Sequence, residues 1–213
     1  MISSEAAVLR NLLTGGNKAE DRHFSHLEIE RLTAYYKVVL KWNPLLNLTT
    51  LTRPEEFWHR HLLESVWLAQ KLSPRIEEVW DLGSGLGVPG IPLAVLRPDL
   101  RVKLVEAQRK KAIFLEEAAA LLKFSQVVIE NTRLENRQFL PERTALIARA
   151  VDKMSEILPH LFRLAEQAEQ VLLLGTGELA KRVEHLVAAN WRIQLHPLPN
   201  SHERLLLLLE RST

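Results

Sequence analysis

The chain has 213 residues, a length that suits one domain, or one domain with an extension, and that can bury a sizeable core. Its net charge is only +2 and its composition is that of an ordinary soluble globular protein, so the overall field does not by itself indicate a nucleic-acid partner. It contains no cysteine, which excludes disulfides, cysteine-held zinc and thiol catalysis.

The chain shows no signal for a membrane. Its start lacks a basic segment followed by an apolar stretch, which is the pattern of a secretory signal. No apolar run approaches the roughly 20 residues that span a bilayer, and the longest one, Leu205 to Leu209, is interpreted as a buried strand. We therefore expect a cytoplasmic protein without a membrane partner.

Helices are predicted for the first third of the chain, although no regular element is predicted for residues 1–24. Residues 25–28 and 52–55 both fit the capping-box pattern that starts a helix. We expect the first of these helices to end at Asn43-Pro44, because the residue before a proline disfavours helical backbone, and the second to end near Leu72.

From Glu77 onward, short apolar runs alternate with helical stretches. This alternation predicts an α/β domain with a mostly parallel sheet over residues 76–213, and residues 1–75 form a helical extension packed on it. The last two strands have no helix between them, which predicts an antiparallel hairpin at one edge. The predicted strands are 79–82, 102–105, 127–129, 145–148, 171–174, 192–197 and 204–210, and the predicted helices are 91–96, 110–122, 154–168 and 179–189.

A glycine-rich turn directly follows the first predicted strand. Four of the chain's eight glycines lie between residues 83 and 90. Ligands of open α/β sheets bind beyond the carboxyl ends of the strands, and a turn of glycines lets the backbone approach them closely. The turn therefore indicates a nucleotide site.

Two kinds of nucleotide fit the spacing of the turn. Gly85, Gly87 and Gly90 match the dinucleotide pattern G-x-G-x-x-G, with Glu106 at the place of the ribose-binding acid. Asp81, with the glycines that follow it, equally fits an S-adenosyl-L-methionine loop. Asp81 would oppose a pyrophosphate at the helix N-terminus but would favour the cationic sulfonium and amino groups, so electrostatics favours S-adenosylmethionine.

Two further groups of residues bear on function. The segment from Arg97 to Lys111 carries six basic and two acidic residues beside the turn, which is typical either of a solvated helix start or of a nucleic-acid contact. His59 and His61 are two apart on a predicted helix and do not share a face, so no metal site is expected.

The turn continues as Gly90-Ile91-Pro92, which is unusual among methyltransferases. With Asp81–Ala94 and Arg97-Pro98 around it, this segment resembles the ribosomal RNA small-subunit methyltransferase G family, also called glucose-inhibited division protein B. The resemblance runs from about residue 30 to the C-terminus. Further segments that carry it are Trp42-Asn43, Asn47-Leu48-Thr49, Arg60–Ser65, Lys110-Lys111, Phe114-Leu115, Arg133, Glu135 and Arg149-Ala150.

The resemblance implies a fold and an activity. The fold is the Rossmann-like, seven-stranded class I S-adenosylmethionine-dependent methyltransferase domain with an N-terminal helical extension. The activity is methyl transfer from S-adenosylmethionine to N7 of a guanine in the 530 loop of bacterial 16S rRNA (guanine 527). The implied partner is 16S rRNA or the small ribosomal subunit, the implied state is a monomer, and no metal is needed. The chain departs from the family pattern at Glu64, Glu106 and the more basic residues 107–109.

The resemblance and the turn together nominate site residues. The cofactor-binding candidates are Asp81, Gly83, Gly85, Gly87, Val88, Glu106, Leu134, Glu135 and Arg149. The RNA-binding candidates are Arg97, Arg109, Lys110, Lys111, Arg133 and His61. Catalysis is expected to depend on in-line positioning, with Arg149 as the one candidate catalytic residue. Two alternatives stay open: a nicotinamide-dependent oxidoreductase and a non-catalytic RNA-binding module.

Overall fold

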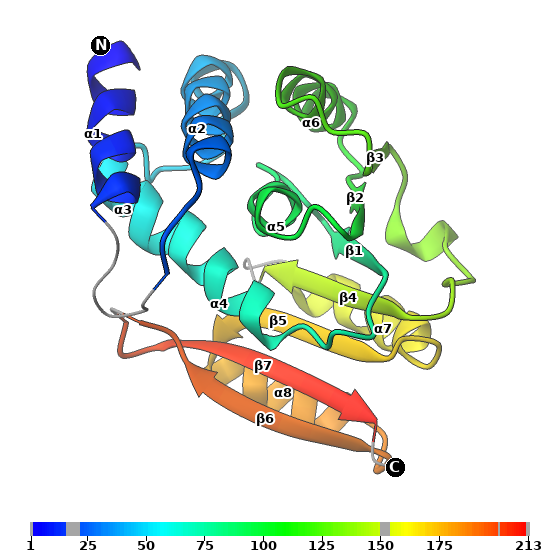
Figure 1. Ribbon diagram of the computed structural model, residues 1–213. Coiled ribbons are helices and arrows are strands. Elements are labelled where there is room, and N and C mark those ends of the chain that lie inside the picture. The colour runs from blue at the N-terminus through cyan, green and yellow to red at the C-terminus, as the bar shows by residue number, and fades with distance from the viewer. Residues whose placement is uncertain (1, 16–21, 150–153, 200, 212–213) are drawn as a thin grey trace.

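The computed structural model describes residues 2–15, 22–149, 154–199 and 201–211, and its centre is a single sheet (Figure 1). The strand order is β3-β2-β1-β4-β5-β7-β6, with parallel pairing from β3 to β5 and antiparallel pairing of β7 with both β5 and β6. This confirms the class I methyltransferase fold and the antiparallel edge hairpin. The strands are β1 (Glu78–Leu82), β2 (Arg101–Val105), β3 (Val127–Glu130), β4 (Thr144–Arg149), β5 (Gln170–Thr176), β6 (Trp191–Pro197) and β7 (Arg204–Arg211).

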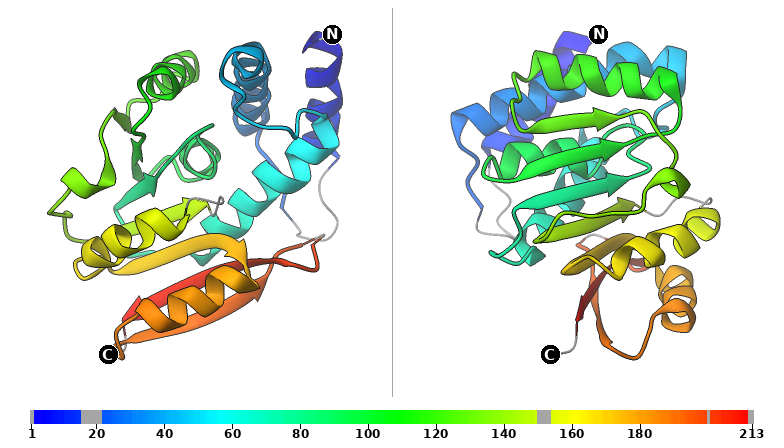
Figure 2. Two further views of the ribbon diagram at one scale, coloured as in Figure 1. Left: turned by 180° about the vertical axis from the view of Figure 1, so that it is seen from behind. Right: turned by 90° about the vertical axis from the view of Figure 1, so that its right-hand side faces the viewer.

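Helices cover both faces of the sheet, and each face has its own hydrophobic core. Figure 2 shows α7 (Met154–Ala165) and α8 (Gly177–Leu186) on one face, where Leu134 also joins their core. The other face carries all the N-terminal helices as well as α5 and α6, which share one core. These are α1 (Ile2–Thr14), α2 (His26–Leu46), α3 (Pro54–Phe57), the π-helical turn η1 (Trp58–Leu62), α4 (Leu63–Lys71), α5 (Gly90–Leu96) and α6 (Arg109–Leu121); a short 3₁₀ turn, η2 (Leu134–Asn136), follows β3.

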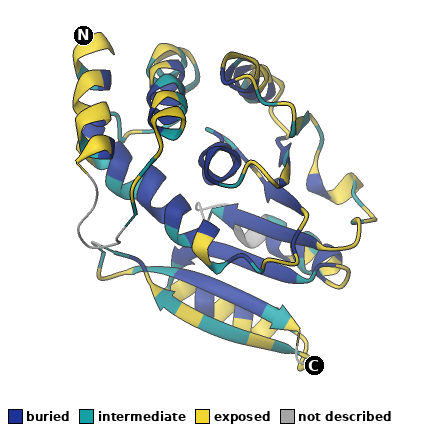
Figure 3. Ribbon diagram, viewed as in Figure 1, coloured by how far each residue is buried: buried dark blue, intermediate teal, exposed yellow. Residues whose placement is uncertain are grey.

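The middle of the sheet is buried on both faces, as Figure 3 shows. Every residue of β1 is buried, and so are all but the last residues of β4 and β5. Continuous apolar runs such as these are expected of parallel strands that lie between two helical layers. The strand β6 has only half-buried and exposed residues, because it lies at the edge of the sheet and pairs with β7 alone. The leucine run of residues 205–209 forms β7, as predicted.

The helix α1 was not predicted, although its sequence carries the signal. Ala6, Leu9 and Leu13 are buried and recur at helical spacing, so one face of α1 packs on the core that α2 shares. The helix lacks a recognisable start signal, and the sequence Thr14-Gly15-Gly16-Asn17 at its end suggests a turn. Gly16 and Asn17 lie outside the described residues.

The first predicted helix starts as expected but ends later. Ser25 Oγ accepts from the Glu28 amide at 3.2 Å and Glu28 Oε2 accepts from the Ser25 amide at 2.7 Å, so the capping box is confirmed. The helix continues past Pro44 to Leu46, where the prediction was wrong. A proline in the last turn costs one helical hydrogen bond, and left-handed Asn47 then ends the helix.

The second predicted capping box does not form. Pro54 lies at the first helical position, so Arg53 is the N-cap residue and makes no side-chain cap. Proline is favoured at the first helical position because an N–H group there would have no helical acceptor. The N-cap is therefore one residue later than in the predicted capping box. The helix then passes through η1 into α4 and ends at Lys71, close to the predicted end.

Gly90, the first residue of α5, is packed too tightly for a side chain. A Cβ built there lies 2.4 Å from Leu104 Cδ2 and 2.6 Å from Asp81 Oδ2. We expect Gly90→Ala to lower the free energy of unfolding by about 1–3 kcal/mol, because the buried side chains of Leu104 and Asp81 have to shift. Urea unfolding measures this, with Gly177→Ala as the control, since a Cβ there meets no atom within 4 Å. Equal losses in both variants would contradict the packing argument.

Candidate functional site

The glycine turn lies between β1 and α5, at the carboxyl edge of the sheet. Gly83, Gly85 and Gly87 all have positive φ, from 55° to 88°, a region that side chains other than glycine rarely adopt. The amides of Gly83 and Ser84 donate to the Val105 carbonyl at 2.9 and 3.1 Å, which anchors the turn to the end of β2. A Cβ on Gly83 would meet nothing within 4 Å, so this side of the turn is open.

Beside this open side lies a cavity of about 150 Å³. Its apolar walls come from the end of β2, from η2 and from α7, an arrangement that suits a flat ring. It brings together three predicted cofactor residues, Gly83, Leu134 and Glu135, with one residue predicted to contact RNA, Arg133. The lining residues are Gly83, Val105, Ala107, Thr132, Arg133, Leu134, Glu135 and Ile157.

Glu106 follows β2 and holds the turn from the other side. Its carboxylate is buried, and Oε2 accepts from the Gly85 amide at 2.8 Å while Oε1 accepts from the Gln108 amide at 2.7 Å. A carboxylate has about four acceptor positions, so each oxygen keeps one lone pair for a further donor. The sequence nominated Glu106 for ribose binding, and the structure adds that it shapes the glycine turn.

Asp81 sits at the end of β1 but does not line the cavity. Its Oδ2 accepts from the Gly90 amide at 3.1 Å and the residue is almost fully buried, so it ties β1 to the start of α5. Burial raises the pKa of this carboxyl to about 7, against hydrogen bonds from Gly90 and Ser84 that favour the charged form. Val88, in the same turn, is also buried.

This raised pKa predicts a pH dependence of stability. Between the ordinary carboxyl pKa and about 7, the unfolded chain ionises Asp81 while the folded chain keeps it protonated, so its contribution to stability is lost as the pH rises. We expect Asp81→Asn to gain about 1–3 kcal/mol relative to the wild type between pH 5 and pH 8. Denaturant unfolding at the two pH values measures this. Parallel pH profiles for both proteins would contradict the assignment.

The helical extension reaches the glycine turn through one hydrogen bond. The Tyr35 hydroxyl of α2 donates to the Leu86 carbonyl at 2.5 Å, and the ring is fully buried. Burial, followed by the nearby Asp81 charge, raises the pKa of Tyr35 well above its ordinary value, so the hydroxyl stays protonated and can donate. The extension is thereby part of the support for the turn.

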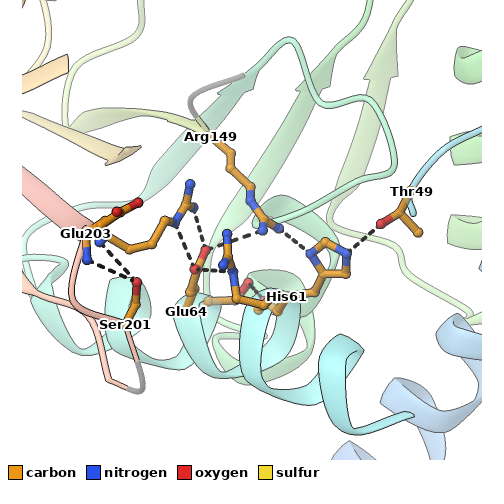
Figure 4. A network of polar contacts seen from close by, with 9 residues as sticks. Thr49, His61, Glu64, Arg149, Ser201 and Glu203 are labelled. Atoms are coloured by element: carbon orange, nitrogen blue, oxygen red, sulfur yellow. Dashed lines mark hydrogen bonds and ion pairs between the residues drawn. The ribbon is translucent and has the colours of Figure 1, made fainter. Parts of the chain in front are cut away.

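Arg149, at the end of β4, belongs to a buried polar network. Figure 4 shows it between Glu64 and His61, with Thr49 beyond His61. Its Nη1 contacts His61 Nδ1, and its Nη2 lies 3.5 Å from Glu64 Oε2. Arg204 of β7 binds the same carboxylate through two hydrogen bonds of 3.1 and 2.8 Å, so Glu64 joins α4, β4 and β7.

The charges of this network set the state of His61. Burial, then Arg149 and Arg60, lower the pKa of His61 well below its ordinary value, so the ring is neutral at physiological pH. Because a guanidinium only donates, Nδ1 accepts from Arg149, and Nε2–H therefore donates to Thr49 Oγ1, 3.1 Å away. Burial lowers the pKa of Arg149 to about 10, which still leaves it charged.

The structure separates the residues that the sequence nominated for RNA. Arg109, Lys110 and Lys111 start α6 at the carboxyl edge, where Arg133 lines the cavity. Arg97 instead follows α5 at the opposite edge and pairs with Asp99 at 2.7 Å, and His61 is buried within its network. The basic face beside the cavity is therefore smaller than the sequence suggested.

Three contributors were missed by the sequence reasoning. Tyr35, Glu64 and Arg204 act through partners 51 to 140 residues away in the chain. No local motif marks them, although Glu64 lies in one of the segments that carried the family resemblance. Within the described part of the chain, no group of three side chains is placed to hold a metal ion, and no helix is long and apolar enough to cross a membrane.

The family model and the curated relatives that match the sequence agree on one family. The family model described as "rRNA small subunit methyltransferase G" matches residues 28–198. A ribosomal RNA small subunit methyltransferase G from Sorangium cellulosum is 38% identical over 172 residues, which cover 76% of this chain and 69% of the relative. One from Xylella fastidiosa strain 9a5c is 35% identical over 181 residues, covering 81% and 82%.

Solved structures support the fold. A precorrin-6y C5,15-methyltransferase from Geobacter metallireducens superposes with a TM-score of 0.56 at 16% identity, covering 78% of this chain and 92% of that one. A ribosomal protein L11 methylase from Lactobacillus delbrueckii gives 0.55 at 17% identity, covering 70% and 77%. At this identity the likeness concerns the fold alone.

Proposed function

Because the chain belongs to the rRNA small subunit methyltransferase G family, we propose that it methylates N7 of a guanine in the 530 loop of 16S rRNA (guanine 527), with S-adenosylmethionine as the methyl donor. One observation carries the choice of donor. The buried carboxyl group of Asp81 lies against the Gly90 amide at the start of α5, where the pyrophosphate of a dinucleotide would have to lie. An acidic group there disfavours a phosphate and favours a nucleotide that carries positive charge, whereas Glu106 fits the ribose of either nucleotide.

The residues around the cavity fit this donor. We propose that the adenine lies between the apolar walls beside Leu134 and Glu135, and that the ribose hydroxyls donate to the free lone pairs of Glu106. The open backbone at Gly83 lets the methionine part pass close to the turn. Arg149 is charged and lies close enough to Asp81 to influence its pKa, so it is proposed to bind the carboxylate of the donor.

Methyl transfer to guanine N7 requires the protein mainly to position the two reactants. When bound, S-adenosylmethionine supplies an electrophilic methyl group on a sulfonium. Guanine N7 has a lone pair and no proton, so the chain needs no general base. Its task is to hold N7, the methyl carbon and the sulfur in line, which is catalysis by proximity. Glu135, which lines the cavity, can stabilise the positive charge that the ring gains.

We propose that RNA binds along the carboxyl edge. The exposed cations at the start of α6 and Arg133 at the cavity flank the place where the guanine must enter, and phosphate contacts dominate RNA affinity. Residues 1–75 extend this surface as the helical part of the enzyme. The partner is 16S rRNA or the small ribosomal subunit, and the enzyme acts as a monomer in the cytoplasm.

A labelling experiment tests the function. Small ribosomal subunits that lack the modification are incubated with the protein and with S-adenosylmethionine carrying a labelled methyl group. We expect label in the 16S rRNA. Calorimetry with S-adenosylmethionine and with NAD runs in parallel. Donor binding without any label would favour a non-catalytic RNA-binding module, and binding of NAD alone would favour an oxidoreductase.

A further inference from the structure

Three arginines surround Glu64 beside the proposed active site. Arg204 and Arg149 bind its carboxylate as described above, and Arg60 Nε lies 3.4 Å from Glu64 Oε1. We propose that this arginine cluster, Arg60, Arg149 and Arg204, contains a phosphate subsite, in which Arg60 and Arg204 hold the RNA backbone next to the target guanine while Arg149 faces the methyl donor. The proposal rests on the proposed function and names a part of its substrate site.

The cluster lies at the edge of the sheet where the guanine must arrive. Arg149 ends β4, and Arg204 begins β7 opposite Thr176, the last residue of β5. Both positions belong to the carboxyl edge that also carries the glycine turn. Arg60 belongs to η1 of the helical extension, so the cluster lies where the extension, β4 and β7 meet.

The charges of the cluster are not balanced within the described residues. Three guanidinium groups face one carboxylate, and His61 beside them is neutral. All three arginines lower the pKa of His61. The electrostatic potential at the His61 ring is therefore positive. Burying unmatched charge is costly, and the buried Arg149 and Arg204 share one carboxylate with Arg60, so an anion stabilises this cluster.

The cluster also retains donors and an opening. The guanidinium group has five N–H donors in a planar fork that matches a phosphate, and Glu64 takes only two from Arg204. The side chains of Arg149 and Arg204 are 13% and 11% exposed, but that of Arg60 is 41% exposed. Solvent, and hence RNA, therefore reaches the cluster from the Arg60 side.

A second anion, the carboxylate of the methyl donor, has to be distinguished from RNA phosphate. Arg149 is the member that influences Asp81 and Tyr35 beside the glycine turn, so it is the one placed to bind the donor. Arg60 belongs to the extension and its side chain is partly exposed to solvent, so it is the member of the cluster that an RNA phosphate can reach. Loss of Arg60 should therefore affect RNA and donor differently.

The test uses Arg60→Gln, with Arg53→Gln as the matched control. Arg53 is an equally basic residue at the start of the same helical segment, 74% exposed and paired with Glu56. Binding of unmodified small subunits is measured from about 50 to 200 mM salt, the range over which phosphate contacts weaken strongly, and donor affinity is measured by calorimetry. A melting curve for each variant shows that it is folded.

We expect Arg60→Gln to weaken subunit binding about tenfold and to reduce the salt slope by about one, with donor affinity within about twofold. Arg53→Gln should change neither value by more than about twofold. If Arg60→Gln melts at a lower temperature than the wild type, Arg60→Lys is used instead. Because lysine keeps the positive charge, we then expect subunit binding and a salt slope like those of the wild type.

Two results would overturn the subsite: unchanged subunit binding and salt slope in the folded variant, or a loss confined to the methyl donor. Failure of the proposed function looks different. In that case the wild-type protein transfers no methyl group, while the comparison of salt slopes can still be made.

Discussion

Replacing Glu106 by alanine is expected to weaken S-adenosylmethionine binding by about 100-fold or more. The Gly85 and Gln108 amides lose their acceptor, and under the proposed binding mode so do the ribose hydroxyls. Hydrogen bonds to a charged group contribute about 1.5–3 kcal/mol each, and about 1.4 kcal/mol changes an affinity tenfold. The loss of the two hydrogen bonds from the ribose hydroxyls therefore accounts for the effect. Calorimetry measures the dissociation constant directly.

Glu116→Ala is the control for this measurement, because it removes the same charge from an exposed position on α6. It should change the affinity by less than about twofold, since exposed charges are screened by solvent. The variant Glu106→Gln keeps one acceptor oxygen and should fall between the wild type and Glu106→Ala. If Glu106→Ala bound the donor as the wild type does, Glu106 would not contact the ribose and would not be needed to shape the turn.

The largest loss of stability is expected for Glu64→Ala, about 3–5 kcal/mol. Removing one partner of a buried ion pair leaves the other charge without compensation, and here three arginines lose the same partner. The loss should also separate the contacts of α4, β4 and β7 and so lower methyl transfer. Urea unfolding followed by circular dichroism gives the free energy.

Glu178→Ala serves as the comparison for Glu64→Ala. Its carboxylate also pairs with an arginine, Arg182, but both side chains are at least half exposed, so the pair contributes about 0.5 kcal/mol or less. A loss below about 1 kcal/mol for Glu64→Ala would mean that solvent or a bound anion compensates the arginines. In that case Glu64 would not be needed to hold α4, β4 and β7 together.

Much of the fold was predictable because its signals are local. Most strands are short apolar runs, and the missing helix between β6 and β7 indicated the antiparallel edge. The ends of the helices were less predictable. Pro44 was taken as the end of α2, and Pro54 moved the start of α3 away from the expected capping box, because one proline can occupy either the last or the first turn of a helix.

The candidate site was predictable where its residues follow strands directly. Gly83 after β1 and Leu134-Glu135 after β3 lie at one cavity, because the carboxyl ends of parallel strands meet at one edge. Contacts between distant segments were not predictable. Glu64 and Arg204 are 140 residues apart, and only the folded chain shows that they share a buried ion pair.

The chemical identity of the methylated nucleotide shows whether this protein is a guanine-N7 methyltransferase of 16S rRNA. Small subunits that lack the modification are treated with the protein and S-adenosylmethionine, the 16S rRNA is digested, and the product is identified and located by mass spectrometry. We expect a single 7-methylguanosine in the 530 loop. A methyl group on another atom or another base, or none on active wild-type protein that binds the donor, would contradict this expectation.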